Sequence, residues 1–329
     1  MEPEISYKRS GYADFALILG VLALIRFLLP RIPVPFSIKP VIDVLLTVVF
    51  LAFPLIAIYR AMSEQPKPKQ ALFIFLAGVM IHGGLVALDL LVFKGQGVVS
   101  SLLAPLKPAG LQVWCIGLGA LVAALISDRN ILIPIGIFLI GYDIFLVLTP
   151  LGFTQKLMQA APDILKQGGM SIPASSTVLP TSGKAEISGI VGPADLVFLG
   201  TFFLAMFRFD MKPYTTLRVM IPVLLCYLLF VMLTGIALPA LVPIGVVTLL
   251  VNWQMFNMTK DEKVSTLVVA VIVALILGYS ATRPKRPVGP LPSAGGPEFQ
   301  KSAGSPDSAS EGQRQLSAPR DGQSTQGPR

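Results

Sequence analysis

The sequence predicts an all-α, polytopic transmembrane helix bundle of about nine helices, each near the length that a bilayer requires. Hydrophobic residues make up 53% of the chain and charged residues 13%, against about 25% charged in an average soluble domain. The mean hydropathy is +0.73. The apolar residues also gather in separate runs, most of them close to the ~20 residues that cross a membrane as a helix. These three observations favour a multi-pass integral membrane protein that contacts the lipid bilayer.

The first apolar run, 14–29, follows a short polar N-terminus, 1–12. Residues 30–33 come next and contain two prolines and an arginine, where a signal peptide would have a small-residue cleavage site. We therefore expect an uncleaved first helix. The other predicted helices are 41–60, 71–93, 110–126, 131–149, 192–209, 216–236, 239–253 and 264–281. Residues 13–281 are the predicted transmembrane domain.

Two polar segments interrupt or follow this pattern. The fifth and sixth runs are separated by roughly 150–191, which is rich in Gly, Ser, Thr and Pro, and we expect a mobile loop there. Residues 282–329 are rich in Pro, Gly, Ser and Gln and contain almost no apolar side chains. Such a tail cannot bury enough surface to offset the entropy of ordering, so we expect it to be disordered.

Charge and cysteine content narrow the class further. The net charge of +8 is spread over loops and the tail, as flanks of membrane helices are, so we expect no nucleic-acid partner. Lys and Arg are divided evenly between the two sides of the bundle, which leaves the orientation open. The two cysteines, Cys115 and Cys226, lie in different apolar runs and are interpreted as free core thiols. The single histidine, His82, is interpreted as bonded to a neighbour.

Two aspartates lie within apolar runs and are the candidate functional residues. Asp143 belongs to the fifth run and Asp195 to the sixth. A carboxylate at membrane depth costs several kcal/mol unless something compensates, which makes each a functional-site hypothesis by default. The end of one run and the start of the next lie on the same side of the membrane. The two acids can therefore lie at a similar depth.

Local helix rules place both acids near that side. Gly192 precedes a proline and is biased away from the α region, and Pro193 suits the first helical position. The sixth helix should therefore begin at Pro193, with Asp195 in its first turn. Asp143 precedes Thr149 by six residues, or roughly 9 Å at about 1.5 Å per residue.

Three short motifs around these acids resemble those of the presenilin and signal peptide peptidase aspartyl proteases. Those families carry Tyr-Asp on one transmembrane helix, Gly-x-Gly-Asp at the start of the next, and Pro-Ala-Leu two helices later. This chain has Tyr142-Asp143, Gly192-Pro193-Ala194-Asp195 and Pro239-Ala240-Leu241. The resemblance covers about 131–253. It departs at Ala194, where the family has glycine. It also departs in the position of Tyr-Asp, which lies on the fifth of nine runs here and on the sixth of nine helices in the family.

The resemblance implies a presenilin-like intramembrane aspartyl protease with Asp143 and Asp195 as the catalytic pair. It implies no metal and no cofactor. The expected substrates are transmembrane-helix proteins or peptides and signal-peptide remnants. The resemblance also implies that substrate is bound by residues beside the acids: Tyr142, Gly192, Ala194, Pro239, Ala240 and Leu241. From helix position, Asp195 has free backbone donors nearby, whereas Asp143 lies inside its helix. We therefore expect Asp143 to hold the proton that the pair shares.

Other interpretations of the same residues remain open. Asp143 and Asp195 could form a proton or cation relay in a transporter or channel, or they could be separate acids, each satisfied by its own neighbour. The chain could also be an inactive scaffold that binds membrane helices. Pro239 could merely start a helix, since proline favours the first turn. Tyr142 could bond a carboxylate or simply pack.

Overall fold

The computed structural model describes residues 10–93, 97–149, 168–177, 186–234 and 238–282. The chain divides into two units, 1–289 and 290–329. The second unit, with the rest of the predicted disordered tail from 283 onward, lies outside the described residues. So do 1–9 of the predicted polar N-terminus.

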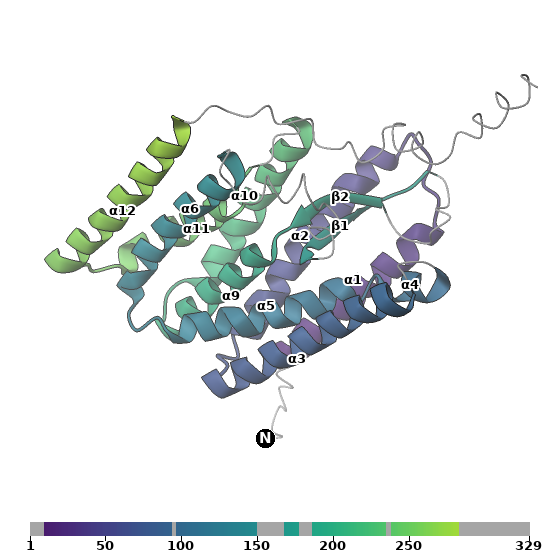
Figure 1. Ribbon diagram of the computed structural model, residues 1–329, viewed down its shortest axis with the longest axis horizontal. Coiled ribbons are helices and arrows are strands. Elements are labelled where there is room, and N and C mark those ends of the chain that lie inside the picture. The colour runs from purple at the N-terminus through teal and green to yellow at the C-terminus, as the bar shows by residue number, and fades with distance from the viewer. Residues whose placement is uncertain (1–9, 94–96, 150–167, 178–185, 235–237, 283–329) are drawn as a thin grey trace, which may run out of the picture. The chain divides into compact units, whose positions relative to one another are not determined.

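The described part of the chain is mostly helical (Figure 1). The helices are α1 (Gly11–Leu28), α2 (Lys39–Met62), α3 (Pro68–Ala87), α4 (Gly97–Leu103), α5 (Lys107–Ala124), α6 (Leu132–Leu148), α9 (Pro193–Arg208), α10 (Pro213–Thr234), α11 (Leu241–Val251) and α12 (Lys260–Ala281). Each of the nine predicted apolar runs coincides with one of them, and α4 is an addition. The helical, polytopic character is therefore confirmed.

The number of membrane spans is a separate question from the number of helices. Among the described residues, seven helices are long and apolar enough to cross a membrane. The other two predicted spans are shorter, since α9 has 16 residues and α11 has 11. The structure thus supports a multi-pass membrane protein, while nine spans stays a prediction.

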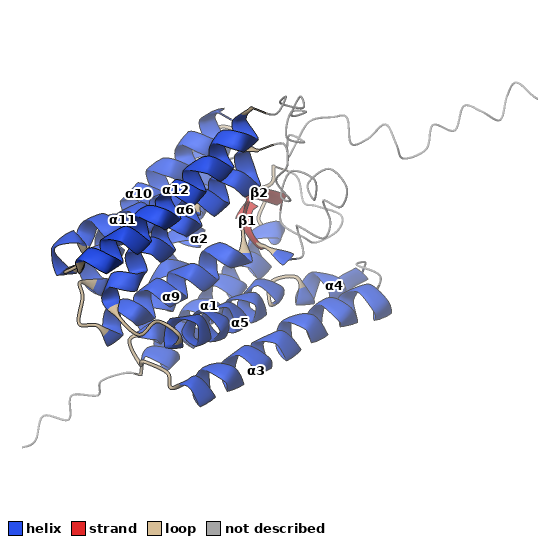
Figure 2. Ribbon diagram, turned by 60° about the vertical axis from the view of Figure 1, so that its left-hand side comes forward, coloured by secondary structure: helices blue, strands red, loops and turns tan. Residues whose placement is uncertain are grey.

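An antiparallel hairpin adds two short strands to the predicted helical bundle. Strands β1 (Met170–Ala174) and β2 (Glu186–Val191) pair within the segment predicted as a mobile loop; they are red in Figure 2. The sequence gives little local sign of a strand here, because Pro173 cannot donate to a ladder and the segment is rich in Gly, Ser, Thr and Pro. The contacts that hold β1 come from distant helices instead. Residues 150–167 and 178–185 of the predicted loop lie outside the described residues.

Helix α9 lies in the interior, where it packs against α5 and α2. Residues 199–206 are all buried, so this helix is apolar on every side, as the core helix of a bundle is. The contact with α5 is close at Gly119, where an added Cβ would lie 2.5 Å from the Val197 carbonyl oxygen. Thr201 Oγ1 donates a hydrogen bond of 3.1 Å to the Gly119 carbonyl oxygen across the same contact.

Helix α11 lies against α6 and also contacts α10 and α9. Small residues set its distance from α6. An added Cβ at Gly136 would lie 2.9 Å from the Leu249 side chain, and one at Gly245 would lie 2.9 Å from that of Ile140. The other side of α6 carries α12, which is almost entirely exposed. These contacts place the start of α11 beside α6.

We predict that the α3–α5 contact depends on Gly78. A Cβ at this position would overlap the backbone of Trp114 in α5. Gly78→Ala should therefore force the helices apart and lower the free energy of unfolding by about 1–3 kcal/mol, the usual cost of overpacking. Thermal unfolding of the purified protein in detergent would measure the change.

Gly83→Ala is the matched control on the same helix, because nothing lies within 4 Å of its added Cβ. Alanine favours a helix over glycine by about 1 kcal/mol, so this variant should be at least as stable as the parent. Equal stabilities for the two variants would contradict the prediction.

Candidate functional site

Asp143 is a buried acid near the C-terminal end of α6, with 8% of its surface exposed. Its Oδ2 accepts a hydrogen bond of 2.7 Å from the backbone N–H of Leu241, the first residue of α11. The first N–H groups of a helix have no partner within that helix. An anionic side chain is also favoured at a helix N-terminus. Asp143 therefore caps α11 from a neighbouring helix.

Asp195 lies in the first turn of α9, as predicted. Helix α9 begins at Pro193, and its N-cap Gly192 is extended, with φ −67° and ψ 149°. The Gly192 N–H donates a hydrogen bond of 3.1 Å to Asp195 Oδ2. This is one half of a capping box, in which an acid at the third helical position bonds the N-cap backbone. The local rules used on the sequence thus gave the correct start of this helix.

The two acids lie in the same region of the fold. The Asp143 carboxyl lies within electrostatic range of the Asp195 carboxyl, although α6 and α9 are far apart in the sequence. Helix α11 contacts both of these helices. The structure therefore brings together three of the predicted site residues, Asp143, Asp195 and Leu241.

Tyr227 of α10 lies near the two acids and is a further candidate that the sequence interpretation missed. Its hydroxyl donates a hydrogen bond of 2.7 Å to the Pro239 carbonyl oxygen, and it lies within electrostatic range of Asp143 and Asp195. A tyrosine in an apolar run usually finds a partner for its hydroxyl. That rule singles out Tyr227 as a candidate, but nothing in the sequence names its partner.

The Pro-Ala-Leu segment is held from both sides. Pro239 and Leu241 are buried, with the Pro239 carbonyl bonded to Tyr227 and the Leu241 N–H bonded to Asp143. Ala240 lies between them in a turn just before α11. Two backbone groups proposed to bind substrate are thus occupied by side chains in this structure. Substrate binding by these residues stays a prediction.

Two other predicted site residues have exposed side chains. Ala194 is exposed in the first turn of α9, so its methyl group is not buried against a neighbouring helix. Tyr142 is 46% exposed and stacks on Phe138 one turn earlier, with ring centroids 5.8 Å apart. That arrangement matches the packing interpretation of Tyr142.

The two cysteines and the histidine differ in their surroundings. Cys115 is buried, and its Sγ lies 3.6 Å from the Pro193 carbonyl oxygen at the start of α9. Cys226 is also free but exposed, so its assignment to the core was wrong. It faces outward because one side of α10 is uncovered in the bundle. His82 Nδ1 lies 2.9 Å from the Lys107 carbonyl oxygen, which confirms a neighbour bond.

Asp143 has a backbone donor, although a position inside a helix predicts none. That expectation is true of donors from α6 itself, yet the Leu241 N–H reaches Asp143 from α11. Each acid therefore has one backbone donor, from Leu241 or from Gly192, and helix position no longer distinguishes them as holders of the shared proton.

Within the described ranges, no three His, Cys, Asp or Glu side chains gather as ligands of a metal ion would. No family model, curated protein or solved structure matches this chain. The function is therefore inferred from the chemistry of the site and from the motif resemblance.

The bond to Leu241 leads to a stability prediction that does not depend on function. Asp143→Leu should leave a buried N–H without a partner and lower the free energy of unfolding by about 1–3 kcal/mol. Asp143→Asn keeps an amide oxygen that can accept the same bond, so it should lose less. Thermal unfolding of both variants in detergent would measure the difference. If the leucine variant is as stable as the asparagine variant, Asp143 does not support the start of α11.

Proposed function

We propose that this chain is an intramembrane aspartyl protease of the presenilin-like kind, with Asp143 and Asp195 as its catalytic pair. The observation that carries the proposal is the hydrogen bond between Asp143 and Leu241, which are 98 residues apart. This bond joins the Tyr-Asp motif to the Pro-Ala-Leu motif, and the Gly-x-x-Asp motif contributes an acid to the same site. Three motifs scattered over the sequence thus contribute to one place in the fold.

The chemistry follows from two neighbouring carboxyl groups. Like charges close together do not both ionise easily, so the pair holds one proton between them. The ionised carboxylate takes a proton from a water molecule as the water oxygen attacks the scissile carbonyl carbon. The protonated carboxyl donates to the carbonyl oxygen as negative charge develops there. The intermediate then collapses, the C–N bond breaks, and the amine leaves with a proton.

The expected substrate is a transmembrane helix or a signal-peptide remnant that unwinds locally. Peptide bonds within a stable helix are shielded, so helix-breaking residues in the substrate should favour cleavage. Tyr227 contributes by fixing the Pro239 carbonyl beside the acids. Ala194 carries a methyl group that the family's glycine lacks, and this methyl group is exposed in the first turn of α9.

Removing either carboxylate should abolish cleavage. Asp143→Asn and Asp195→Asn keep the side-chain shape but cannot share the proton, and members of a catalytic unit fail together. The purified protein would be incubated with a labelled transmembrane peptide, with and without an aspartyl-protease transition-state analogue. We expect parent activity that the analogue blocks, and no activity in either variant.

Asp210→Asn is the control for this experiment. Asp210 is exposed beyond the end of α9, with a left-handed φ of 48° that asparagine also adopts. The Asp210→Asn variant should be as active as the parent. Turnover by Asp143→Asn or Asp195→Asn would refute the proposal. Proton or cation flux through the reconstituted parent protein, lost in those two variants, would favour the relay.

Tyr227→Phe should lower the rate of peptide cleavage by up to about tenfold. A tenfold loss corresponds to an increase of roughly 1.4 kcal/mol in the activation free energy. The ring is kept, and only the hydroxyl that bonds the Pro239 carbonyl is lost. Tyr214→Phe, on the exposed start of the same helix, is the control and should cleave normally. Equal rates for both variants would remove Tyr227 from the site.

A further inference from the structure

Arg26 is a buried arginine within α1, a helix long and apolar enough to span a membrane. Only 8% of its surface is exposed, and its guanidinium lies 4.6 Å from the centroid of the Phe50 ring of α2. The sequence pattern favours a side chain that extends to the membrane surface, as arginines near helix ends commonly do. A charge kept inside a membrane bundle is costly and marks function by default.

The guanidinium of Arg26 binds the start of β1. Nη1 donates a hydrogen bond of 3.0 Å to Ser171 Oγ, and Nη2 donates one of 2.5 Å to the Ser171 carbonyl oxygen. Two donors thus engage one residue through its side chain and its backbone. The fork geometry of arginine allows this, and the single ammonium of lysine does not reproduce it.

The end of β1 is held by charged side chains from α2. Asp43 Oδ1 accepts hydrogen bonds of 2.7 Å from both the N–H and the hydroxyl of Ser175. Lys39 forms an ion pair of 3.0 Å with Asp43 and also donates to the Ser175 carbonyl oxygen. The strand is therefore fixed to α1 at one end and to α2 at the other.

The hairpin leads directly into the helix that carries Asp195. Met170 and Ser171 of β1 pair with Val191 and Ile190 of β2. The residue after β2 is Gly192, whose N–H bonds the Asp195 carboxyl. A fixed β1 therefore fixes the end of β2 and, with it, the first turn of α9.

We infer that Arg26 and Asp43 are positioning residues for Asp195, acting through the hairpin. The inference rests on the proposed function, because it assigns these two side chains to the same catalytic pair. The hairpin connects the polar contacts of Arg26 and Asp43 to the start of the helix that carries Asp195. Misplacing a catalytic group by about 1 Å can cost ~100-fold in rate.

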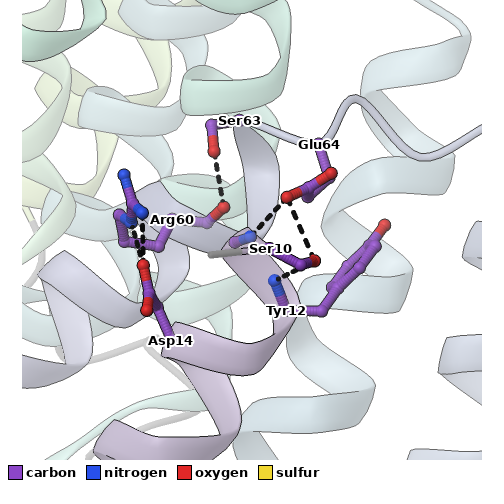
Figure 3. Close-up of polar contacts among 7 residues, drawn as sticks. Ser10, Tyr12, Asp14, Arg60, Ser63 and Glu64 are labelled. Carbon is purple, nitrogen blue, oxygen red and sulfur yellow. Dashed lines mark hydrogen bonds and ion pairs between the residues drawn. The ribbon is translucent and has the colours of Figure 1, made fainter. Parts of the chain in front are cut away.

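A second polar contact between α1 and α2 provides a matched control (Figure 3). Arg60 of α2 forms an ion pair with Asp14 of α1, and the Arg60 Nε lies 2.7 Å from Asp14 Oδ2. Nearby, Glu64 accepts hydrogen bonds from Ser10 and Gly11. These contacts tie the same two helices together at the start of α1 and do not involve the hairpin.

The experiment compares Arg26→Gln, Arg26→Lys and Arg60→Gln in full-length protein cleaving a labelled transmembrane peptide. We expect Arg26→Gln to lower kcat about 10- to 100-fold with a smaller change in KM, because the acid is displaced while Tyr142 and the Pro-Ala-Leu segment stay in place. Arg26→Lys should recover part of the loss. Asp43→Ala, which removes both bonds to Ser175, should resemble Arg26→Gln, and Arg60→Gln should keep the parent kcat.

Backbone hydrogen exchange over residues 188–198 is the second measurement. Exchange there should become faster in Arg26→Gln and Asp43→Ala and stay unchanged in Arg60→Gln. Faster exchange in Arg26→Gln, with no cleavage by the parent, would reject the protease while keeping the coupling between Arg26 and α9. Normal cleavage and normal exchange in Arg26→Gln would overturn the inference and leave the protease intact.

If Arg26→Gln does not fold, Ser171→Ala tests the same contact more gently, because it removes only the hydrogen bond from Arg26 Nη1. Ser171→Ala should also lower kcat, by a smaller factor than Arg26→Gln. The effect of Ser171→Ala should also shrink in the Arg26→Lys background, as expected for residues in direct contact. If Ser171→Ala and Arg26→Lys both lower the stability but leave kcat unchanged, Arg26 has only a packing role. That outcome would refute the inference.

Discussion

The rest of the site depends on one hydrogen bond, from the Leu241 N–H to Asp143. Helix α11 begins beside α6 within an apolar bundle, where an unpaired backbone N–H costs several kcal/mol. The Asp143 carboxylate is also buried and needs a hydrogen-bond donor. The hydrogen bond satisfies both the Leu241 N–H and the Asp143 carboxylate, so the fold must place these two groups together. Pro239 and Tyr227 then complete the arrangement by holding the preceding carbonyl.

The two acids reach this place by different routes. Asp143 is positioned by helix packing, because Gly136 and Gly245 let α6 and α11 approach closely. Asp195 is positioned by the start of its helix, which the hairpin precedes and α5 supports at Gly119. The first route is apolar and tolerates little change in side-chain volume. The second depends on a few polar contacts to β1, which are directional and easily removed one at a time.

The features that the sequence could predict are local ones. Nine apolar runs became helices, and the start of α9 at Pro193 followed from two neighbouring residues. The features it could not predict all need a partner far along the chain. The hairpin is held by Arg26 and Asp43, and the capping of α11 comes from Asp143. An apolar pattern reports that a segment is buried, but it does not report which polar groups meet inside.

The double use of Asp143 has a thermodynamic consequence. Its Oδ2 both caps α11 and belongs to the pair of acids. A molecule that takes this oxygen for itself leaves the Leu241 N–H open to a new acceptor, such as the carbonyl of that same molecule. Occupancy of the site and the order of the first turn of α11 are then linked, and linkage is reciprocal. Whatever strengthens the bond from the Leu241 N–H to Asp143 weakens, by the same factor, the binding of a molecule that needs this oxygen. The helix end therefore acts as a competing ligand built into the chain.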